Sequence, residues 1–493
     1  GICGQCLVRI EAGCVNDPTK NELNKLTTAQ LAQGVRLACQ VRPCQNVRIR
    51  IERSAPHASW RNLLEDEYTP FDFSPQSITT FTQKHSSYGV AIDLGTTQIR
   101  LSLWDTGKKQ RLAGRVGLNP QSYFGTDVLT RLMNASESPD RMQEIGRLVR
   151  DAIGGALRDI LVEGGWNGQE IGRIMIVGNS AMLALLAERN AHLLLQPESW
   201  IRAIDCQPEN TDSWRRSWGC DANAIIEVIQ PLAGFVGSDL LAGVLAIKLT
   251  QGTAGSLLVD FGTNSEIALW DGRQLWVTSA AGGPAFEGWG ISCGMPAEPG
   301  AIYRAGCKGD SSSLEIEVIG GGQARGVCGS GLVDIIGSLR QSGELKRNGQ
   351  FTGNFGHEGF CILKGSRDIV LHKQDIDMFQ RAKAAISAGI TCLLNQSGLN
   401  SRDVRRVCVC GAFGRFLNVS NAQAIGLLPG IAPEHVELCG NAALAGAEML
   451  LCSDKTRTLE SLRRNMRIIN MSSDPIYENL FIEHLYLQPM LLD

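Results

Sequence analysis

The sequence lacks three features that would point directly to a functional class: a long apolar run, an excess of basic charge, and histidines at metal-binding spacing. No apolar stretch reaches the ~18 residues that suggest a membrane-spanning helix. The 493-residue chain has a formal net charge of -3, which gives no support to nucleic-acid binding because that activity usually leaves a basic footprint. The seven histidines form no ligand-spaced pair, and we assign them no metal.

The composition is that of an ordinary globular protein, with 43% hydrophobic and 20% charged residues. The length alone suggests about three domains. There is no signal peptide, but Gly1 is not an initiator Met, so we expect the sequence to begin inside a longer protein. Most of the 16 cysteines stand singly in apolar stretches, as Cys392 and Cys452 do. This distribution favours a reduced, cytoplasmic protein over a disulfide framework.

The first 87 residues divide into a small β-rich unit and a linker. In residues 1–53, the segments 7–10 and 47–51 alternate apolar and polar side chains, as half-buried strands do. Residues 54–87 hold several prolines and a Ser- and Thr-rich run, which is typical of a linker. A linker of this length would let the first unit swing between two docking positions.

From Tyr88 onward, strands and helices alternate, which predicts an α/β fold. A strand at 89–92 is followed by a hairpin partner at 99–104, and the theme of strand, Asp, Gly-Thr and strand returns at 254–269. We therefore predict two related lobes, residues 88–245 and residues 246–493. Within these lobes we expect further elements: amphipathic helices at 141–162 and 375–396, and strands at 174–179 and 407–410.

A cysteine pair near the N-terminus indicates an iron–sulfur site. Plant-type ferredoxins space their thiolates C-x4-C-x2-C with a distant fourth. Cys3 and Cys6 match the inner pair and Cys39 the distant ligand, and a further cysteine is then expected about six residues before Cys3. A zinc ribbon that uses Cys39 and Cys44 as its second half is an alternative. The sequence around these cysteines resembles the [2Fe–2S] ferredoxin family, which implies a β-grasp domain. The resemblance also implies that Cys14 and Cys44 are not ligands.

Two copies of Asp-x-Gly-Thr suggest a phosphate-binding cleft. A nucleotide's phosphates need backbone N–H groups, small side chains that allow close approach, and carboxylates that hold hydrated Mg²⁺. A single copy is weak, because a strand that ends in an Asp-Gly turn is common, whereas two copies in matching strand context are much stronger. We assign catalytic roles to Asp93 and Asp260. The predicted nucleotide contacts in these loops are Gly95, Thr96, Thr97, Gly262, Thr263 and Asn264.

The order of these motifs resembles the actin, Hsp70 and sugar-kinase superfamily. That resemblance implies a two-lobed ATPase fold in which the two Asp-x-Gly-Thr copies are the phosphate loops. Residues 231–246 and 440–447 are similar to the two connecting helices of that superfamily, and residues 411–414 to its adenosine loop. The loop adds three predicted nucleotide contacts: Gly411, Ala412 and Gly414.

The whole combination resembles the reductive activators of corrinoid proteins. The segments that carry this narrower resemblance are 119–125, 177–179, 283–288, 328–331 and the neighbourhood of Gly414. It implies an enzyme that uses ATP to support reduction of a Co(II) corrinoid protein to Co(I) in a methyltransferase system. The implied cofactors are a [2Fe–2S] cluster, ATP and Mg²⁺, and the implied partners are the corrinoid protein, an external low-potential electron donor and a second copy in a homodimer. Members of that family usually carry an extra middle domain before the nucleotide-binding part, and we expect this chain to lack it.

Three other functions are compatible with parts of the sequence. A sugar-kinase-like enzyme fused to a ferredoxin would need a catalytic base near a substrate hydroxyl, for which Asp239 and Glu287 are candidates. An activator of a radical dehydratase would follow similar logic but generally uses a bridging [4Fe–4S] cluster. A redox scaffold with a degenerate nucleotide site is opposed by the intact Asp93 and Asp260. Glu287 is otherwise interpreted as a structural or cleft carboxylate, and Cys293 and Cys328 as small packing residues.

Overall fold

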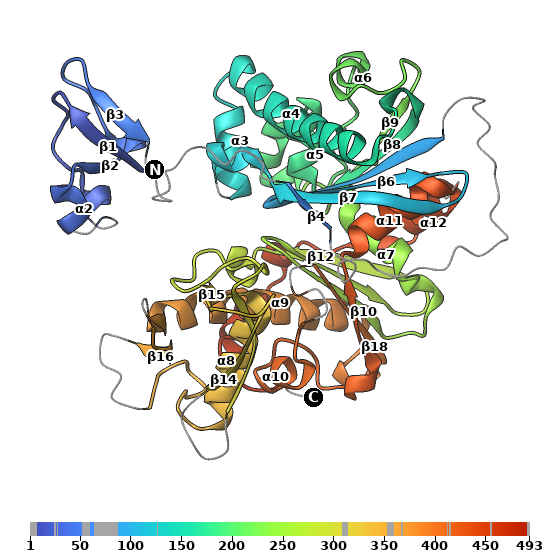
Figure 1. The fold of residues 1–493 in the computed structure, drawn as a ribbon. Coiled ribbons are helices and arrows are strands. Elements are labelled where there is room, and N and C mark those ends of the chain that lie inside the picture. Colours follow the sequence, from blue (N-terminus) through green and yellow to red (C-terminus); the bar gives the residue numbers. More distant parts are fainter. Residues whose placement is uncertain are drawn as a thin grey trace.

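The computed structural model describes most of the chain beyond the first residues. The described residues are 7–23, 26, 28–51, 60–63, 87–125, 127–307, 314–352, 359–365, 368–411, 413, 416–453 and 456–490. They form a small N-terminal unit and two larger lobes, which Figure 1 shows with the first lobe above the second. Among these residues, no helix is long and apolar enough to cross a membrane.

The N-terminal unit is a three-stranded sheet with order β2-β1-β3, in which both neighbours pair with β1 in antiparallel fashion. Both segments expected to be strands are confirmed as β1 and β3. The elements of this unit are β1 (Leu7–Ala12), α1 (Lys20–Leu23), α2 (Thr28–Ala32), β2 (Val35–Leu37), the short 3₁₀ turn η1 (Ala38–Gln40) and β3 (Arg48–Ile51).

Each lobe is built on a six-stranded mixed sheet, and the two sheets share one topology over five of their strands. In the first lobe the order is β4-β7-β6-β5-β8-β9, and in the second it is β19-β18-β10-β11-β12-β20. Each contains an antiparallel meander followed by two parallel strands (β5, β6, β7, β8, β9 and β10, β11, β12, β18, β19). The predicted duplication is therefore present in the fold. The strands are β4 (Arg61–Asn62), β5 (Tyr88–Leu94), β6 (Gln98–Asp105), β7 (Gln110–Leu118), β8 (Ile171–Gly178), β9 (Ile225–Val228), β10 (Ser256–Phe261), β11 (Ser265–Trp270), β12 (Leu275–Ala280), β18 (Arg406–Gly411), β19 (Val436–Gly440) and β20 (Met466–Ile468).

Helices cover the outer face of each sheet. On the first lobe, α4 begins after Ser138, whose side chain accepts from the Arg141 N–H, and ends at Gly165 in the left-handed conformation. Its apolar stripe is buried against the sheet, as predicted. The outer helices are α3 (Val128–Ala135), α4 (Pro139–Gly164), α5 (Ser180–Ala187) and α6 (Asp212–Trp218) in the first lobe, and α8 (Gly329–Gln341), α9 (Lys373–Ser397), α10 (Val419–Ala424) and α13 (Tyr477–Glu483) in the second. The second lobe also carries two small sheets, made of β13 (Ala301–Cys307), β14 (Leu314–Val318) and β15 (Gly326–Val327), and of β16 (Phe360–Leu363) and β17 (Ile369–Leu371).

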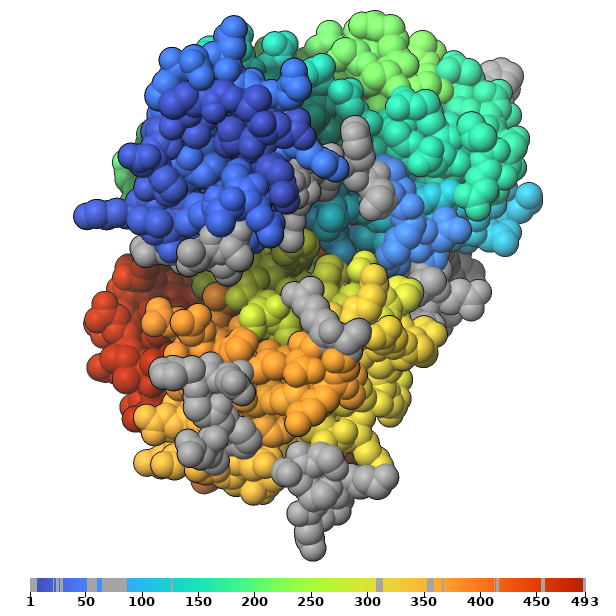
Figure 2. All heavy atoms as spheres, turned by 60° about the vertical axis from the view of Figure 1, so that its left-hand side comes forward, coloured from blue at the N-terminus to red at the C-terminus, as the bar shows by residue number. Residues whose placement is uncertain are grey.

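Two helices lie between the sheets and join the lobes. The predicted connecting helices are confirmed as α7 (Ser238–Ala246) and α11 (Ala442–Cys452), which pack against each other (Figure 1). Their apolar residues share one core with the inner faces of both sheets, and the helix α12 (Thr456–Arg464) adds to it. A single apolar core therefore spans the junction of the lobes. Figure 2 shows the first lobe above this junction and the second lobe below it.

One part of the predicted linker is structured, and there the prediction is wrong. Arg61 and Asn62 form β4, which pairs antiparallel with β7 at the edge of the first lobe's sheet. Trp60 packs over Gly117 and the buried Leu63 packs over Gly114, where any side chain larger than glycine would collide with them. A local composition rich in proline and serine gave no hint of this contact, because the pairing partner lies more than fifty residues away in sequence.

Candidate functional site

A cleft between the lobes brings together every predicted nucleotide residue that the structure describes. Ala412 and Gly414 lie outside the described residues. The others line one cavity beside α7 and α11: Asp93, Gly95, Thr96, Thr97, Asp260, Gly262, Thr263, Asn264 and Gly411.

The two phosphate loops meet across the cleft. In the first loop the Gly95 N–H donates to the Gln98 carbonyl (3.0 Å), and a Cβ at Gly95 would lie 2.7 Å from that oxygen, so the turn requires glycine. The hydroxyls of Thr97 and Thr263 are 2.9 Å apart. Both also donate to the carboxylate of Glu287, which follows the second loop. Glu287 therefore ties the first lobe to the second at the point where phosphates are predicted to bind.

Arg131 and Asn179 hold the first phosphate loop in place through Thr96. Arg131 is buried on α3 and donates to the Thr96 carbonyl (2.7 Å). Asn179 caps α5 by accepting from the Met182 N–H and donates to the Thr96 hydroxyl (2.9 Å). The loop's backbone is thus fixed by side chains from two helices, which is the preorganisation that a phosphate site needs.

Besides Glu287, four carboxylates line the cleft and repel one another. Burial raises the pKa of Asp93, which the Arg100 guanidinium (3.9 Å) and the Asn441 amide (2.7 Å) counteract. Burial and Asp93 raise the pKa of Asp239 to about 7. Burial, Asp239 and Asp93 raise the pKa of Asp260 to about 8. Burial and Asp239 raise the pKa of Glu266 well above its usual value.

These carboxylates fit a divalent cation. One oxygen of Glu266 is buried and has no hydrogen-bond partner among the described residues. A buried, unpaired carboxylate oxygen beside further carboxylates is costly, and hard oxygen ligands of this kind are what Mg²⁺ binds. The residues that would hold the ion, directly or through its waters, are Asp93, Asp239, Asp260 and Glu266.

The predicted adenosine loop begins where the aromatic core reaches the cleft. Gly411 has φ of 83°, and a Cβ there would lie 2.3 Å from an Asp260 oxygen, so only glycine fits. Phe413 lines the cleft and packs on Phe261 (4.6 Å between ring centroids) and Phe286 (5.3 Å). This apolar floor is suited to a nucleoside.

Sequence reasoning missed several cleft residues or named them only for another function. Arg100 and Glu266 are the cross-strand partners of Asp93 and Asp260 in their hairpins. The register of the two hairpins could have predicted Arg100 and Glu266, because each lies directly opposite its aspartate on the neighbouring strand. Asn179 and Asn441 lie in segments that carry the family resemblance, but their contacts, like those of Arg131, are long-range and were not predicted. Glu287, a candidate kinase base that was interpreted as a structural or cleft carboxylate, is a cleft carboxylate that contacts both lobes.

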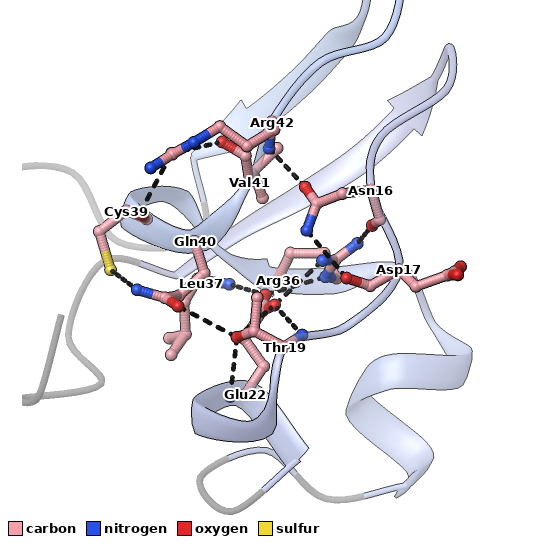
Figure 3. A network of polar contacts seen from close by, with 10 residues as sticks. All are labelled: Asn16, Asp17, Thr19, Glu22, Arg36, Leu37, Cys39, Gln40, Val41 and Arg42. Carbon is pink, nitrogen blue, oxygen red and sulfur yellow. Dashed lines mark hydrogen bonds and ion pairs between the residues drawn. The ribbon is translucent and has the colours of Figure 1, made fainter.

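The N-terminal unit presents Cys39 at one end of its sheet. Cys39 is exposed in η1, directly after β2. Beneath it, Arg36 donates to the buried Glu22 (2.9 Å), and Glu22 also accepts from the Leu37 N–H (3.0 Å), which fixes the end of β2 (Figure 3). Cys3 and Cys6 lie outside the described residues.

The strand register shows which ends of β1 and β2 lie together. Leu7, where β1 begins, pairs with Leu37, where β2 ends, and Cys39 follows Leu37 by two residues. The start of β1 therefore lies at the same end of the sheet as Cys39. Among the described residues, Cys14, Cys39 and Cys44 do not converge as a metal-binding group.

Comparisons with known proteins place the chain in a family. A family model described as the RACo middle region matches residues 88–252, and one described as the C-terminal domain of RACo, the ASKHA domain, matches residues 254–492. Corrinoid activation enzyme RamQ of Eubacterium limosum is 30% identical over 418 residues, which cover 80% of this chain and 69% of that relative. The chain belongs to the family of reductive activators of corrinoid proteins.

Other members of this family, and a solved structure, are also similar. The Co(II) methylated amine-specific corrinoid protein reductase of Methanosarcina barkeri is 25% identical over 426 residues, covering 80% of this chain and 76% of the relative. A solved reductive activator for corrinoid, iron-sulfur protein matches with a TM-score of 0.73 and 24% identity, covering 99% of this chain and 92% of its own. The two-lobed ATPase fold predicted from the sequence is thereby confirmed.

The middle-region match coincides with the first lobe, since it covers residues 88–252. The absence of an extra domain before the nucleotide-binding part stays a prediction.

Proposed function

We propose that this chain is an ATP-dependent reductive activator that delivers one electron to an inactive Co(II) corrinoid protein and restores Co(I). One electron leaves an external low-potential donor, passes through the N-terminal unit and reduces cobalt by one oxidation state. The observation that carries the proposal is the duplicated Asp-x-Gly-Thr cleft in a family member whose N-terminal unit also presents an exposed Cys39.

The electron transfer is thermodynamically difficult without help. For a one-electron couple, each 59 mV of unfavourable potential lowers the equilibrium constant tenfold. A protein shifts such an equilibrium only as far as it binds one state of its partner more tightly than the other. The role proposed for the two lobes is to adopt, under the control of ATP, a conformation that favours the reducible state of the corrinoid protein.

The contacts at the cleft link nucleotide occupancy to the lobes. Thr97 lies in the first loop, Thr263 in the second, and Glu287 accepts from both. A phosphate chain would compete for the same hydroxyls and for the same backbone donors. Filling the cleft therefore changes the contacts that hold the lobes together, and Asp93 and Asp260 would hold the Mg²⁺ that neutralises the phosphates.

Cys39, Cys3 and Cys6, with a cysteine upstream, are the proposed ligands of a [2Fe–2S] cluster. When bound, such a cluster supplies a one-electron carrier. The chain's own contribution is to hold the Cys39 thiol exposed at the end of β2, through the buried Arg36–Glu22 pair. The partners proposed are a corrinoid protein of a methyltransferase system and a low-potential donor, and the homodimer stays a prediction.

The direct test uses the purified protein. It is mixed with a Co(II) corrinoid protein and a low-potential reductant, with and without ATP, while the Co(I) absorbance is followed. We expect Co(I) to form substantially only with ATP. Reduction that ignores ATP, or no reduction under either condition, would overturn the proposal.

Two variants separate the two halves of the mechanism. Asp260→Ala should abolish the effect of ATP and leave the visible spectrum of the cluster intact, and Asp159→Asn, an exposed change on α4, should alter neither. Cys39→Ser should remove the cluster spectrum and leave ATP binding intact, and the exposed Cys14→Ser is its control. Loss of the cluster spectrum in Cys14→Ser would instead show that the ligands are misassigned.

A further inference from the structure

Two cysteines and a glutamate converge on the second lobe, with a third cysteine beside them, at a place that the proposed activity does not use. Strands β18 and β19 run parallel at one edge of the sheet, with Cys408 opposite Glu437. A register shift before Cys410 pairs that residue with Gly440. Cys439 therefore lies between Leu438, which pairs with Val409, and Gly440. Side chains two apart on a strand share a face, so all four lie on the side of the sheet that faces α7 and α11.

The burial pattern confirms this arrangement. Cys408 and Cys410 belong to the apolar core around α7 and α11, and Cys439 packs against it. Val407 and Val409, which alternate with these two cysteines along β18, belong to the core on the opposite face. The four side chains are therefore held on one face by the strands themselves.

The ligand-type atoms lie close enough to share one ion. The Cys408 thiol, a Glu437 carboxylate oxygen and the Cys439 thiol are all within 4.8 Å of one another. The Cys408 thiol lies 3.9 Å from Glu437 Oε2, and side-chain hydrogen bonds join Cys439 to both Cys408 and Cys410. A tetrahedral Zn²⁺ with Zn–S bonds of about 2.3 Å sets its sulfur ligands roughly 3.8 Å apart, so small rotamer changes would bring these atoms into place.

This set differs from the other cysteines of the chain. Among the residues that the structure describes, no other three His, Cys, Asp or Glu side chains converge so closely. Thiolates with one carboxylate form a soft ligand set that suits Zn²⁺ and does not suit Mg²⁺. The site is also reachable, because Glu437 is exposed and Cys439 is half-buried.

One cation already competes for the glutamate. Arg406 donates to both Glu437 oxygens, at 2.7 Å each. An ion would therefore be held chiefly by the Cys408 and Cys439 sulfurs, and the neighbouring Cys410, Glu437 or a water would complete its coordination. Each thiol gives up a proton on binding, and no electron is transferred.

We propose that Cys408, Cys410 and Cys439, with Glu437 beside them, form a binding site for a thiophilic divalent cation of the Zn²⁺ type. The site lies directly behind the cleft, because β18 ends at Gly411 and β19 leads through Gly440 to Asn441, and all three residues line the cleft. A bound ion would tie these two strand ends together and would fix Asn441, which donates to Asp93.

The first test uses the unmodified, full-length protein and Zn²⁺ alone. Cysteines are alkylated with iodoacetamide, and mass spectrometry measures the rate at each one, so that zinc bound by the N-terminal cysteines is read separately. We expect one equivalent of Zn²⁺ to slow alkylation of Cys439 about tenfold or more, because a metal-bound thiolate is a poor nucleophile. Cys452, which is also half-buried and lies on α11, serves as the internal control. Equal rates at Cys439 with and without Zn²⁺ would overturn the proposal.

The second test counts the metal. Cys439→Ser should bind about one Zn²⁺ fewer per chain than the unmodified protein, and Cys452→Ser should bind the same number. X-ray absorption at the zinc edge should lose part of its sulfur scattering in Cys439→Ser only. Unchanged zinc content in a folded Cys439→Ser variant would overturn the site, and if that variant does not fold, the alkylation result decides.

Discussion

The carboxylates of the cleft are the residues whose behaviour depends most on what is bound. Asp93 has two polar partners, whereas one oxygen of Glu266 has none among the described residues. Burying like charges together is unfavourable unless a cation or a proton neutralises them. Without a cation the cleft therefore holds protons that water-exposed carboxylates would have released.

This proton uptake predicts a pH dependence that a divalent cation reverses. The pKa of Asp239 is raised to about 7 and that of Asp260 to about 8, from the usual 3.8. Between pH 3.8 and about 8 the folded protein thus binds more protons than the unfolded chain, so its stability falls as pH rises. Mg²⁺ binds the ionised carboxylates, and we expect it to raise the melting temperature more at pH 8 than at pH 6. In Asp260→Asn this difference should shrink, and an equal Mg²⁺ effect at both pH values would contradict the assignment.

A second residue, Glu448, joins distant parts of the chain. It is fully buried on α11 and accepts from Ser102 (2.6 Å), Trp104 (3.2 Å) and Arg111 (2.8 Å) of the first lobe. Glu448→Ala removes the acceptor that these donors share, and breaking such a buried ion pair costs about 3–5 kcal/mol. The partly exposed Glu298, which pairs with Arg325, should cost about 0–1 kcal/mol when changed to Ala. Urea unfolding measures both, and similar costs for the two variants would contradict the role of Glu448.

At the scale of elements, the crossing of α7 and α11 sets how the lobes meet. A Cβ on Gly446 would lie only 2.0 Å from the Ala242 carbonyl oxygen of α7, whereas a Cβ on Gly243 would be in ordinary contact at 3.6 Å with Ala442. The helices therefore approach each other most closely at Gly446. Any residue larger than glycine there must push the helices apart.

The two glycines make a matched pair of tests. Gly446→Ala should lower the free energy of unfolding by about 1–3 kcal/mol, the usual cost of overpacking. It should also weaken the ATP effect, because it shifts the lobes. Gly243→Ala should be neutral or should stabilise by up to about 1 kcal/mol, since alanine favours a helix. Chemical unfolding and ATP titration distinguish them, and a harmless Gly446→Ala would show that the helices move apart easily.

Local patterns predicted the elements well and their long-range contacts poorly. The stripe of α4, the two hairpins and the small residues of α7 and α11 are periodic signals within one segment, and each element is present. The cleft aspartates followed from their turns. Glu287, Arg131 and Asn441 could not be predicted in their roles, because each acts on a residue far away in sequence. β4 was missed for the same reason, since only its pairing with β7 makes it a strand.

At the scale of the whole molecule, the repeated topology places two equivalent loops on either side of one cleft. The inner helices and both sheets share a core, so the lobes are coupled by packing as well as by the contact of Thr97, Thr263 and Glu287. The chain that leaves the N-terminal unit first meets the two lobes at β4, which pairs with β7. The position of β4 therefore sets the point from which the N-terminal unit is tethered.

The anchoring of β4 can be tested by hydrogen exchange at its partner strand. Leu63→Asp puts a charge into a buried position and should detach β4, whereas Asn62→Ala changes an exposed side chain on the same strand. Hydrogen exchange at Val116, the partner of Arg61, should accelerate in Leu63→Asp only. Nucleotide affinity should be unchanged in Asn62→Ala, whereas Leu63→Asp also displaces Arg61, which lines the cleft. Unaltered exchange in Leu63→Asp would mean that the strand pairing contributes little.

The position of β4 also fixes how far an electron carrier can travel. Only eight residues, 52–59, separate β3 from Trp60, and a chain of that length spans at most about 30 Å. A tether through the 36 residues up to Tyr88 would be several times longer. Because effective concentration falls roughly as the −3/2 power of tether length, the shorter attachment raises the local concentration of the N-terminal unit about tenfold. A partner docked within that radius meets its donor by a first-order step, at a rate that dilution of the protein does not change.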